Sequence, residues 1–267
     1  MEYSIKDIIR DRRSVRTYSG EPLRSEDRSK LEEFINSLES PFGVPVEFRF
    51  LEGKKYGLTS PVLVGADLYL GAKVPRAEKS EIAFGYDFEK VVLYAQSLGI
   101  GTVWIAGTMN RPAFEKAMEV KENEVMHAIT PIGYTADKMS VRESVMRRGV
   151  KADERLPFET LFFRESFSSP LTQDDAGKLL DALMMVRLAP SAVNKQPWRV
   201  VVCGDTVHFY KKGSRGMAEI QKVDIGIAIA HLVLTLSESG VSGEFVDCDP
   251  KLEHGDDTEY IISYVIG

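Results

Sequence analysis

The chain has 267 residues, 43% of them hydrophobic, and carries a formal net charge of −6 at pH 7. Its length and apolar fraction predict a globular protein with one large domain or two modest ones, and its acidic balance argues against general binding to nucleic acid or to a membrane surface. Cys203 and Cys248 are the only cysteines and lack metal-ligand spacing, and no apolar run reaches the length of a membrane span. We therefore expect a cytoplasmic protein without a disulfide framework or a metal site.

A cluster of positive charge lies near the start of the chain. Residues 10–16, RDRRSVR, contain four arginines and a single aspartate. Like charges this close together need a partner or full solvation. The segment is either a solvated helix end or an anion-binding site, since arginine side chains and a hydroxyl such as that of Ser14 suit phosphate oxygens.

Two stretches further along the chain share one order of elements. In the first, apolar residues at helical spacing lead to Pro41 and then to a β-rich run over residues 46–51. In the second, a helix is predicted from a cap at Thr172, Pro190 opens a loop, and residues 198–203 predict a strand. Each stretch is therefore interpreted as a helix–loop–strand unit.

A second pair of segments repeats in the same order. Two buried helices are predicted to end at Gly99 and Gly240, each with another glycine 14 residues earlier and each followed by a strand. The later helix is apolar almost all round, so it should lie in a core, with His231 as a buried core histidine. Repeated order and spacing favour an internal duplication over chance similarity. The charged segment 140–167 is interpreted as the crossover between the copies, and residues 259–267 as a closing strand.

The segments RRSVRTYSGEPL and LAPSAVNKQPWRVVV, together with the glycine-ended helix and strand in YAQSLGIGTVWIAG, resemble the nitroreductase family of FMN-dependent oxidoreductases. Ordinary members of that family carry both motifs in each subunit of a homodimer, with FMN in the interface. In this chain the first motif is kept only near the N-terminus and the second only in the later copy. The chain therefore resembles the subfamily in which two degenerate halves are fused.

This resemblance implies an α+β, nitroreductase-like fold in which two similar halves, each with an antiparallel sheet and helices, are fused as a pseudo-dimer. Residues 1–150 form the first half, with the phosphate-binding arginines and the loop at the flavin N5. Residues 151–267 form the crossover and the second half, with the flavin-contact loop PSAVN. The fusion implies one FMN per chain and a monomer, because the chain already contains the interface that relatives form by dimerising.

The site residues follow from the matched motifs. The resemblance implies that the FMN phosphate is bound by the arginine segment, and that two residues of WIAG lie near the flavin N5. It implies further that the PSAVN loop lines the ribityl and dimethylbenzene side. The residues are Arg12, Arg13, Ser14 and Arg16 for the phosphate, Ala106 and Gly107 for N5, and Pro190, Ser191, Ala192 and Asn194 for the remaining side.

Three sets of residues have alternative interpretations. Arg155 resembles a later phosphate-binding arginine of the family, although Asp153 replaces the lysine expected nearby, and Arg147 and Arg148 are the substitutes. Lys54 or Lys55 is either a positive charge near the flavin pyrimidine edge or an exposed loop lysine. Gln196 and Trp198 either contact the cofactor or have only a structural role.

The implied activity is that of an FMN-dependent NAD(P)H oxidoreductase that reduces nitro, quinone or similar small-molecule acceptors by ping-pong hydride transfer. No catalytic side chain is required, because the chemistry takes place at the flavin N5. An FMN-binding carrier or sensor with little turnover is the alternative, since one of the two sites is lost and Ala106 stands where many relatives have glutamate. A structural relic with an empty site is the third possibility.

Overall fold

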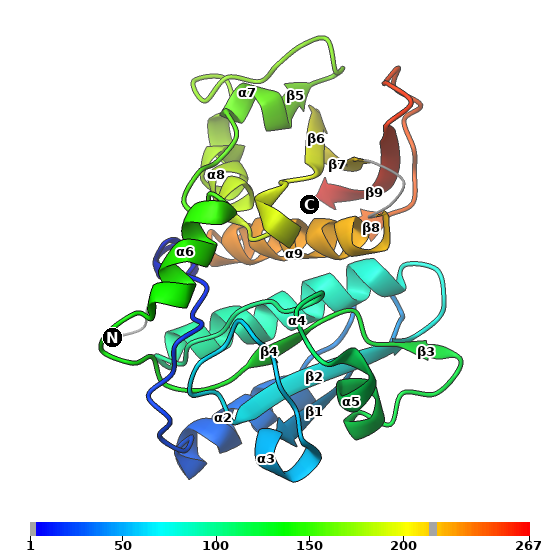
Figure 1. Cartoon of the computed structure of the whole chain (residues 1–267). Coiled ribbons are helices and arrows are strands. Elements are labelled where there is room, and N and C mark those ends of the chain that lie inside the picture. Colours follow the sequence, from blue (N-terminus) through cyan, green and yellow to red (C-terminus); the bar gives the residue numbers. More distant parts are fainter. Residues whose placement is uncertain (1–3, 214–217) are drawn as a thin grey trace. The chain divides into compact units, whose positions relative to one another are not determined.

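The computed structural model describes residues 4–213 and 218–267 of the chain (Figure 1). These residues divide into two compact units. The N-terminal unit comprises residues 11–153, and the C-terminal unit comprises residues 4–10 together with the described part of residues 154–267. The helix α1 (Ile5–Asp11) begins the described chain.

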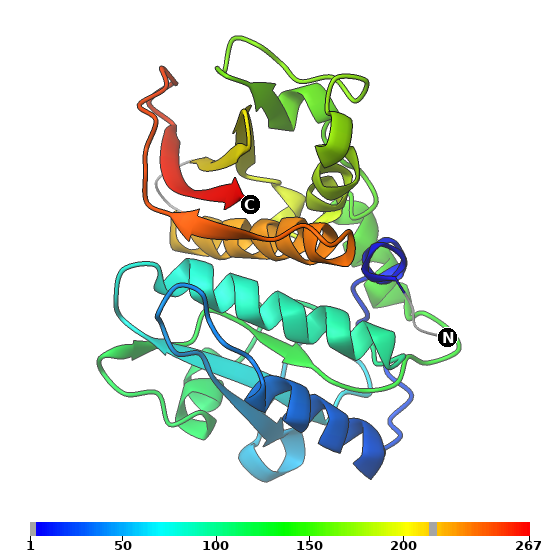
Figure 2. The ribbon, with the colours of Figure 1, turned by 180° about the vertical axis from the view of Figure 1, so that it is seen from behind.

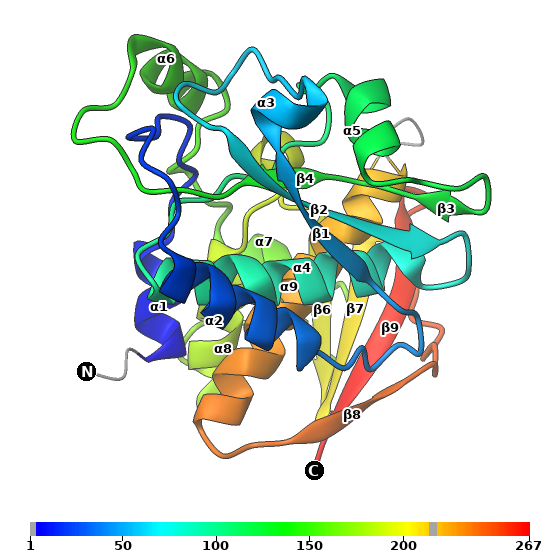
Figure 3. The ribbon, with the colours of Figure 1, turned by 90° about the horizontal axis from the view of Figure 1, so that it is seen from below.

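The N-terminal unit is a sheet with helices on both faces. Its elements are α2 (Ser25–Asn36), β1 (Glu47–Glu52), α3 (Gly53–Tyr56), β2 (Leu68–Pro75), α4 (Ser80–Ser97), α5 (Arg111–Ala117), β3 (Glu124–Val125), β4 (Ile129–Pro131) and α6 (Val141–Gly149). The strand β2 pairs antiparallel with each of β1, β3 and β4. Seen end-on, α2 and α4 cover one face of this sheet, and α3 and α5 lie on the other (Figure 3).

Alternation along the strands sends apolar side chains into both layers of the N-terminal unit. Leu70 packs into a cluster with Leu31 of α2 and Val91 of α4. Its neighbour Tyr69 points to the opposite cluster, where it meets Phe114 of α5 edge-on with ring centroids 5.1 Å apart. Figure 2 shows α2 and α4 running side by side on their face. The unit thus has two apolar layers separated by one sheet.

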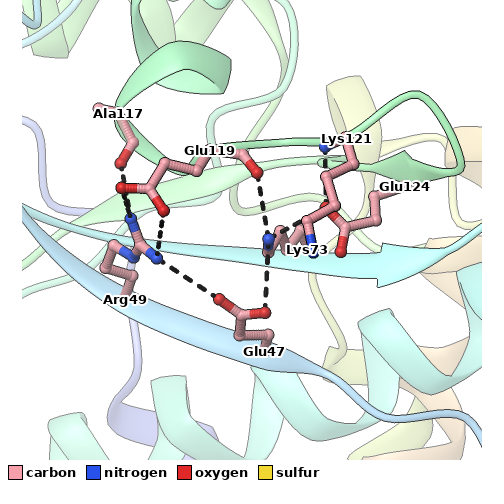
Figure 4. A network of polar contacts seen from close by, with 7 residues as sticks. All are labelled: Glu47, Arg49, Lys73, Ala117, Glu119, Lys121 and Glu124. Carbon is pink, nitrogen blue, oxygen red and sulfur yellow. Dashed lines mark hydrogen bonds and ion pairs between the residues drawn. The ribbon is translucent and has the colours of Figure 1, made fainter.

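A network of charged residues crosses the N-terminal sheet at β1 and β2 (Figure 4). Lys73 of β2 is only 4% exposed, and its Nζ lies 3.0 Å from Glu124 and 3.4 Å from Glu47. The same Nζ donates to the carbonyl oxygen of Glu119, whose carboxylate pairs with Arg49. Because the ammonium group has two carboxylate partners, its burial is tolerated. The network joins β1 and β2 to the connection between α5 and β3.

The C-terminal unit contains a five-stranded sheet in the order β5-β6-β7-β9-β8. Its elements are α7 (Phe158–Leu161), β5 (Phe162–Arg164), the 3₁₀ helix η1 (Gly177–Leu179), α8 (Leu180–Leu188), the 3₁₀ helix η2 (Ala192–Asn194), β6 (Trp198–Cys203), β7 (Thr206–Lys212), α9 (Ala218–Glu238), β8 (Gly243–Val246) and β9 (Thr258–Ile266). The pair β5–β6 is parallel and the other pairs are antiparallel. The predicted antiparallel sheet is therefore mixed at this edge.

The helix α9 is the core helix of the C-terminal unit. Over Glu219–Glu238 it is long and apolar enough to cross a membrane, with mean hydropathy 1.4, but 72% of that stretch is buried in the protein. His231 is fully buried, and its Nδ1 lies 2.8 Å from the carbonyl oxygen of Met185 in α8. The prediction of a satisfied core histidine is confirmed.

Several local predictions are confirmed where short-range chemistry decides the conformation. The strand β6 spans the predicted residues 198–203, and β1 begins one residue later than predicted. Gly99 and Gly240 each follow a core helix with φ of +73°, a left-handed conformation that glycine adopts without strain. Both helix–loop–strand units are present, in the same order, one in each unit of the chain.

Three local predictions are wrong. The segment after Gly99 is no regular strand, because residues 101–105 pair with their neighbours only through isolated bridges. Thr172 caps a turn, accepting from the Asp175 N–H at 3.2 Å, and the helix begins later, at Gly177. The crossover segment is more regular than expected, since it contains α6, α7 and β5.

Candidate functional site

The arginine segment lies extended along residues 101–105 of the N-terminal unit. Ser14 forms a parallel bridge with Thr102, and the Val15 N–H donates to the Thr102 carbonyl at 2.9 Å. Val15 is 3% exposed, which anchors the segment in the core, while Arg12, Ser14 and Arg16 are half-buried. From Ser14 onward this alternation follows from extended backbone, where every second side chain faces the same way. Arg13 is exposed.

Arg12 and Arg16 have buried donors without acceptors. In the part of the chain that the structure describes, Nε and Nη1 of both guanidinium groups are buried and make no hydrogen bond. Buried side-chain donors in proteins are nearly always paired. Burial lowers the pKa of both residues, opposed by Glu89 for Arg12 and by Glu143 for Arg16. Four donors on two cations are therefore available to an anionic acceptor.

Arg147 of α6 is a third cation in this environment. Its charge adds to the lowering of the pKa of both Arg12 and Arg16, so it lies within electrostatic range of both. Arg147 pairs with Asp153, whereas Arg148 is exposed. Of the two substitutes considered for a further phosphate-binding arginine, Arg147 is the one whose charge acts on Arg12 and Arg16.

Glu143 is a buried residue of this region that the sequence reasoning did not single out. It is 3% exposed, and its Oε2 accepts from the Arg16 N–H at 3.1 Å and from the Thr17 hydroxyl at 2.7 Å. Ser140 caps α6 by accepting from the Glu143 N–H, so the pattern Ser-x-x-Glu at a helix start was the available signal. Glu143 fixes the backbone of the arginine segment and leaves the Nε and Nη1 donors of Arg16 unpaired.

The predicted N5 segment follows directly on the residues that hold the arginine segment. A Cβ added at Gly107 would meet nothing within 4 Å, so the backbone there is open to close approach. Arg111 holds this segment in place by donating hydrogen bonds to the carbonyl oxygens of Ala106 at 2.9 Å and His127 at 3.2 Å. Arg111 is a second residue that sequence reasoning missed, because its partners are backbone carbonyls without a sequence signature.

The C-terminal unit brings together Arg155 and the PSAVN loop. Arg155 Nη2 donates to the carbonyl oxygen of Leu188, two residues before Pro190, at 3.3 Å. The Asn194 side chain donates to the carbonyl oxygen of Glu154 at 3.0 Å. Arg155 therefore lies beside the loop of the C-terminal unit, whereas Arg147 belongs with the arginine segment of the N-terminal unit.

Two further residues of the motif have structural contacts. Gln196 is 3% exposed and its Oε1 accepts from the Leu156 N–H at 2.9 Å, while Trp198 is fully buried. Lys54 is 88% exposed and pairs with Asp67, which agrees with an exposed lysine, but it lies in the short helix α3 and not in a loop. No group of three or more His, Cys, Asp or Glu residues able to hold a metal ion occurs among residues 4–213 and 218–267.

Comparison with known proteins identifies one family and many solved structures that resemble this chain. The model of a family described as "Putative TM nitroreductase" matches residues 4–236. A putative nitroreductase from Thermotoga maritima MSB8 has a similar structure, with a TM-score of 0.66, 20% identity, and coverage of 99% of this chain and 94% of its own. No curated protein matches. The α+β, nitroreductase-like fold predicted from the motifs is thereby confirmed.

Smaller solved structures also match. A nitroreductase family protein from Clostridium novyi NT has a TM-score of 0.44 and 19% identity, over 51% of this chain and 87% of its own. An FMN-dependent nitroreductase from Clostridium difficile R20291 has a TM-score of 0.41 and 19% identity, over 50% of this chain and 88% of its own. The family assignment depends on neither, because the family model alone spans most of the 267 residues, and the chain belongs to the family of putative TM nitroreductases.

Proposed function

We propose that this chain binds one FMN and is an oxidoreductase that uses it. The observation that carries the proposal is the set of buried, unpaired Nε and Nη1 donors on Arg12 and Arg16. The FMN phosphate is close to a dianion at neutral pH and offers several acceptor oxygens. Family membership supports a flavin over other phosphate ligands, since FMN-dependent reduction is what the motifs imply.

In this proposal the residues of the chain bind and orient the cofactor. Arg12 and Arg16 donate charge-assisted hydrogen bonds to the phosphate, Ser14 adds a hydroxyl, and Arg147 contributes a third positive charge. Pro190–Asn194 and Arg155 are the further residues proposed to contact FMN. FMN, when bound, would supply hydride and electron transfer at its N5 between a reductant and an oxidant.

The segment around Ala106 and Gly107 carries no ionisable side chain, so its role in the proposal is positional. Gly107 leaves room for the cofactor ring, and Arg111 keeps the backbone of Ala106 in place. We propose NAD(P)H as the electron donor and a nitro compound, a quinone or a similar small molecule as the acceptor. The lack of an ionisable group in this segment also suits a carrier or sensor with little turnover, which is the alternative.

Flavin titration of matched variants tests the binding site. Loss of one arginine–phosphate hydrogen bond, worth roughly 1.5–3 kcal/mol, should weaken FMN binding about tenfold to a hundredfold in Arg16→Ala. Arg164→Ala is the control, because Arg164 already donates to the carbonyl oxygen of Asp175 at 2.8 Å. Equal affinities in the two variants, or two FMN per chain, would contradict the proposal.

Anaerobic titration of the FMN-loaded protein with NADH and NADPH then separates the enzyme from the carrier. Bleaching of the flavin absorbance, followed by recovery on addition of a nitroaromatic or a quinone, supports the oxidoreductase. Stable FMN binding without reduction by either nucleotide favours the carrier or sensor.

A further inference from the structure

The loop that follows Pro190 has an unusual backbone. Val193, Asn194 and Gln196 have φ values of +45°, +56° and +49°, in the left-handed region that non-glycine residues seldom occupy. Val193 is the least suited of the three, because its Cβ is branched, and its side chain is 57% exposed. Such a conformation persists only where surrounding contacts impose it, and it is typical of functional loops.

Hydrogen bonds restrain this loop from within and from the preceding chain. The Gln196 N–H donates to the Ser191 hydroxyl oxygen at 2.9 Å, and the Leu156 N–H donates to the Gln196 Oε1 at the same distance. Asn194 adds its bond to the carbonyl of Glu154. These contacts link the loop to residues 154–156, which are themselves irregular.

The core helix α9 supplies a restraint of a different kind. The Ala192 N–H donates to Oδ1 of Asp224 at 3.0 Å. Asp224 is 2% exposed, and its helix neighbours Val223 and Ile225 are fully buried. Its Oδ2 is buried without a hydrogen-bond partner among the residues the structure describes. A carboxyl in this place is costly to bury, and this burial raises its pKa well above the ordinary value.

A residue selected for the stability of α9 alone would be apolar at this position. Among the residues that the structure describes, the carboxyl group makes one hydrogen bond, and that bond reaches the strained loop, so holding the loop accounts for its presence. We propose that Asp224 is a positioning residue that holds the loop 190–196 in the conformation that receives the flavin. The reference to flavin depends on the FMN function proposed above, whereas the restraint on the loop does not.

Two substitutions separate positioning from stability. Asp224→Asn keeps an acceptor oxygen at the place of Oδ1, and Asp224→Leu removes the acceptor and the buried carboxyl together. Because Leu suits the apolar core, we expect the urea midpoint of the Leu apoprotein to be equal to or above that of the wild type. The same variant should bind FMN about tenfold more weakly, while Asn should bind it within threefold of the wild type.

Hydrogen exchange provides a readout that needs no cofactor. In the apoprotein, amides of the loop 190–196 should exchange at least tenfold faster in Asp224→Leu than in the wild type, and Asp224→Asn should restore slow exchange. Thr235→Val is the matched control, because Thr235 is a buried polar residue of the same helix whose hydroxyl bonds within α9, to the carbonyl of His231. This control should change neither loop exchange nor FMN affinity.

The possible outcomes distinguish the two proposals. Wild-type protein that fails to bind FMN refutes the proposed function, and faster loop exchange in the Leu variant would still support the restraint by Asp224. Unchanged exchange in Asp224→Leu overturns the restraint, whatever the flavin does. Faster exchange with undiminished FMN affinity overturns the link between this restraint and the cofactor. If Asp224→Leu lowers both the urea midpoint and the FMN affinity, and Asp224→Asn lowers both as well, the role of Asp224 is structural only.

Discussion

His127 should make the stability of the N-terminal unit sensitive to acid. Its side chain is 6% exposed, and its Nε2 is buried without a hydrogen-bond partner among the described residues. Phe84 meets the imidazole edge-on, with ring centroids 5.2 Å apart. Burial, together with the positive charges of Arg111 and Arg76, lowers the pKa of His127 from 6.5 to about 4. The imidazole is therefore neutral in the folded protein across the physiological range.

The sign and size of the effect follow from proton linkage. Between pH 6.5 and 4 the unfolded chain binds the proton at His127 and the folded chain does not, so stability falls as the pH falls. The stability associated with the neutral imidazole of His127 is fully present above pH 6.5. At about 1.4 kcal/mol for each pH unit, the contribution of His127 alone should destabilise the protein by about 2 kcal/mol at pH 5 and by about 3 kcal/mol at pH 4.

Asp87 of α4 acts in the opposite direction over nearly the same range. It is 2% exposed, and burial raises its pKa from 3.8 to about 6. Here the folded chain binds the extra proton between pH 3.8 and 6, so stability rises on acidification. The two effects partly offset each other in the wild type, and each is measured as the difference in stability between the parent and the variant that lacks that residue.

The measurement compares His127→Phe and Asp87→Asn with the parent chain. Each of the two units contains one tryptophan, so a Trp198→Phe background leaves Trp104 as the reporter of the N-terminal unit. In urea unfolding from pH 8 to pH 4.5, His127→Phe should gain roughly 2–3 kcal/mol relative to its parent as the pH falls. Asp87→Asn should be most stabilising above pH 6, and its advantage should disappear near pH 4. A His127→Phe difference that stays constant across this range would refute the assignment of a buried neutral imidazole.

Three further outcomes are expected. Arg111→Met should destabilise the N-terminal unit by about 2–3 kcal/mol in urea unfolding, because three carbonyl oxygens lose a charged donor, whereas Arg76→Met should change it little. Val193→Gly should raise apoprotein stability by about 1 kcal/mol, since relief of the positive φ exceeds the added chain entropy; a loss of stability there would contradict the strain. Light scattering should give the mass of a single chain at low micromolar concentration, and an obligate dimer would overturn the expectation that the fused halves are self-sufficient.

The sequence predicted those parts of the fold that depend on neighbouring residues. Gly99 and Gly240 end their helices because the required backbone conformation is local, and strand 198–203 follows from its own apolar residues. The strand predicted after Gly99 was wrong, because the conformation of residues 101–105 does not depend on neighbouring residues. Its hydrogen bonds go to residues distant in sequence, including the Val15 N–H and Ile129, and nothing in its own composition reveals that the partners meet it only at single bridges.

The candidate site also contains residues that the sequence identifies and residues that only the folded structure identifies. The motif supplied the identities of Arg12 and Arg16, because arginines beside a serine suit a phosphate. It could not supply the place of Arg147, which depends on where α6 packs, and it gave no indication of Asp224, whose hydrogen bond to Ala192 joins a helix to a distant loop. Residues that bind through their own chemistry can be found in a sequence, whereas residues that position others depend on the folded structure.

The charges around the arginine segment explain how it can remain ready for an anion. Arg147 lowers the pKa of both Arg12 and Arg16, and Arg12 also lowers that of Arg16, so such a cluster would be costly without compensation. Glu89 and Glu143 are buried nearby and supply that compensation. Each carboxylate is also engaged elsewhere, Glu89 with the Trp104 indole N–H at 2.8 Å and Glu143 with backbone and hydroxyl donors. The carboxylates therefore reduce the repulsion while the Nε and Nη1 donors of Arg12 and Arg16 stay unpaired, which is the arrangement that an incoming phosphate requires.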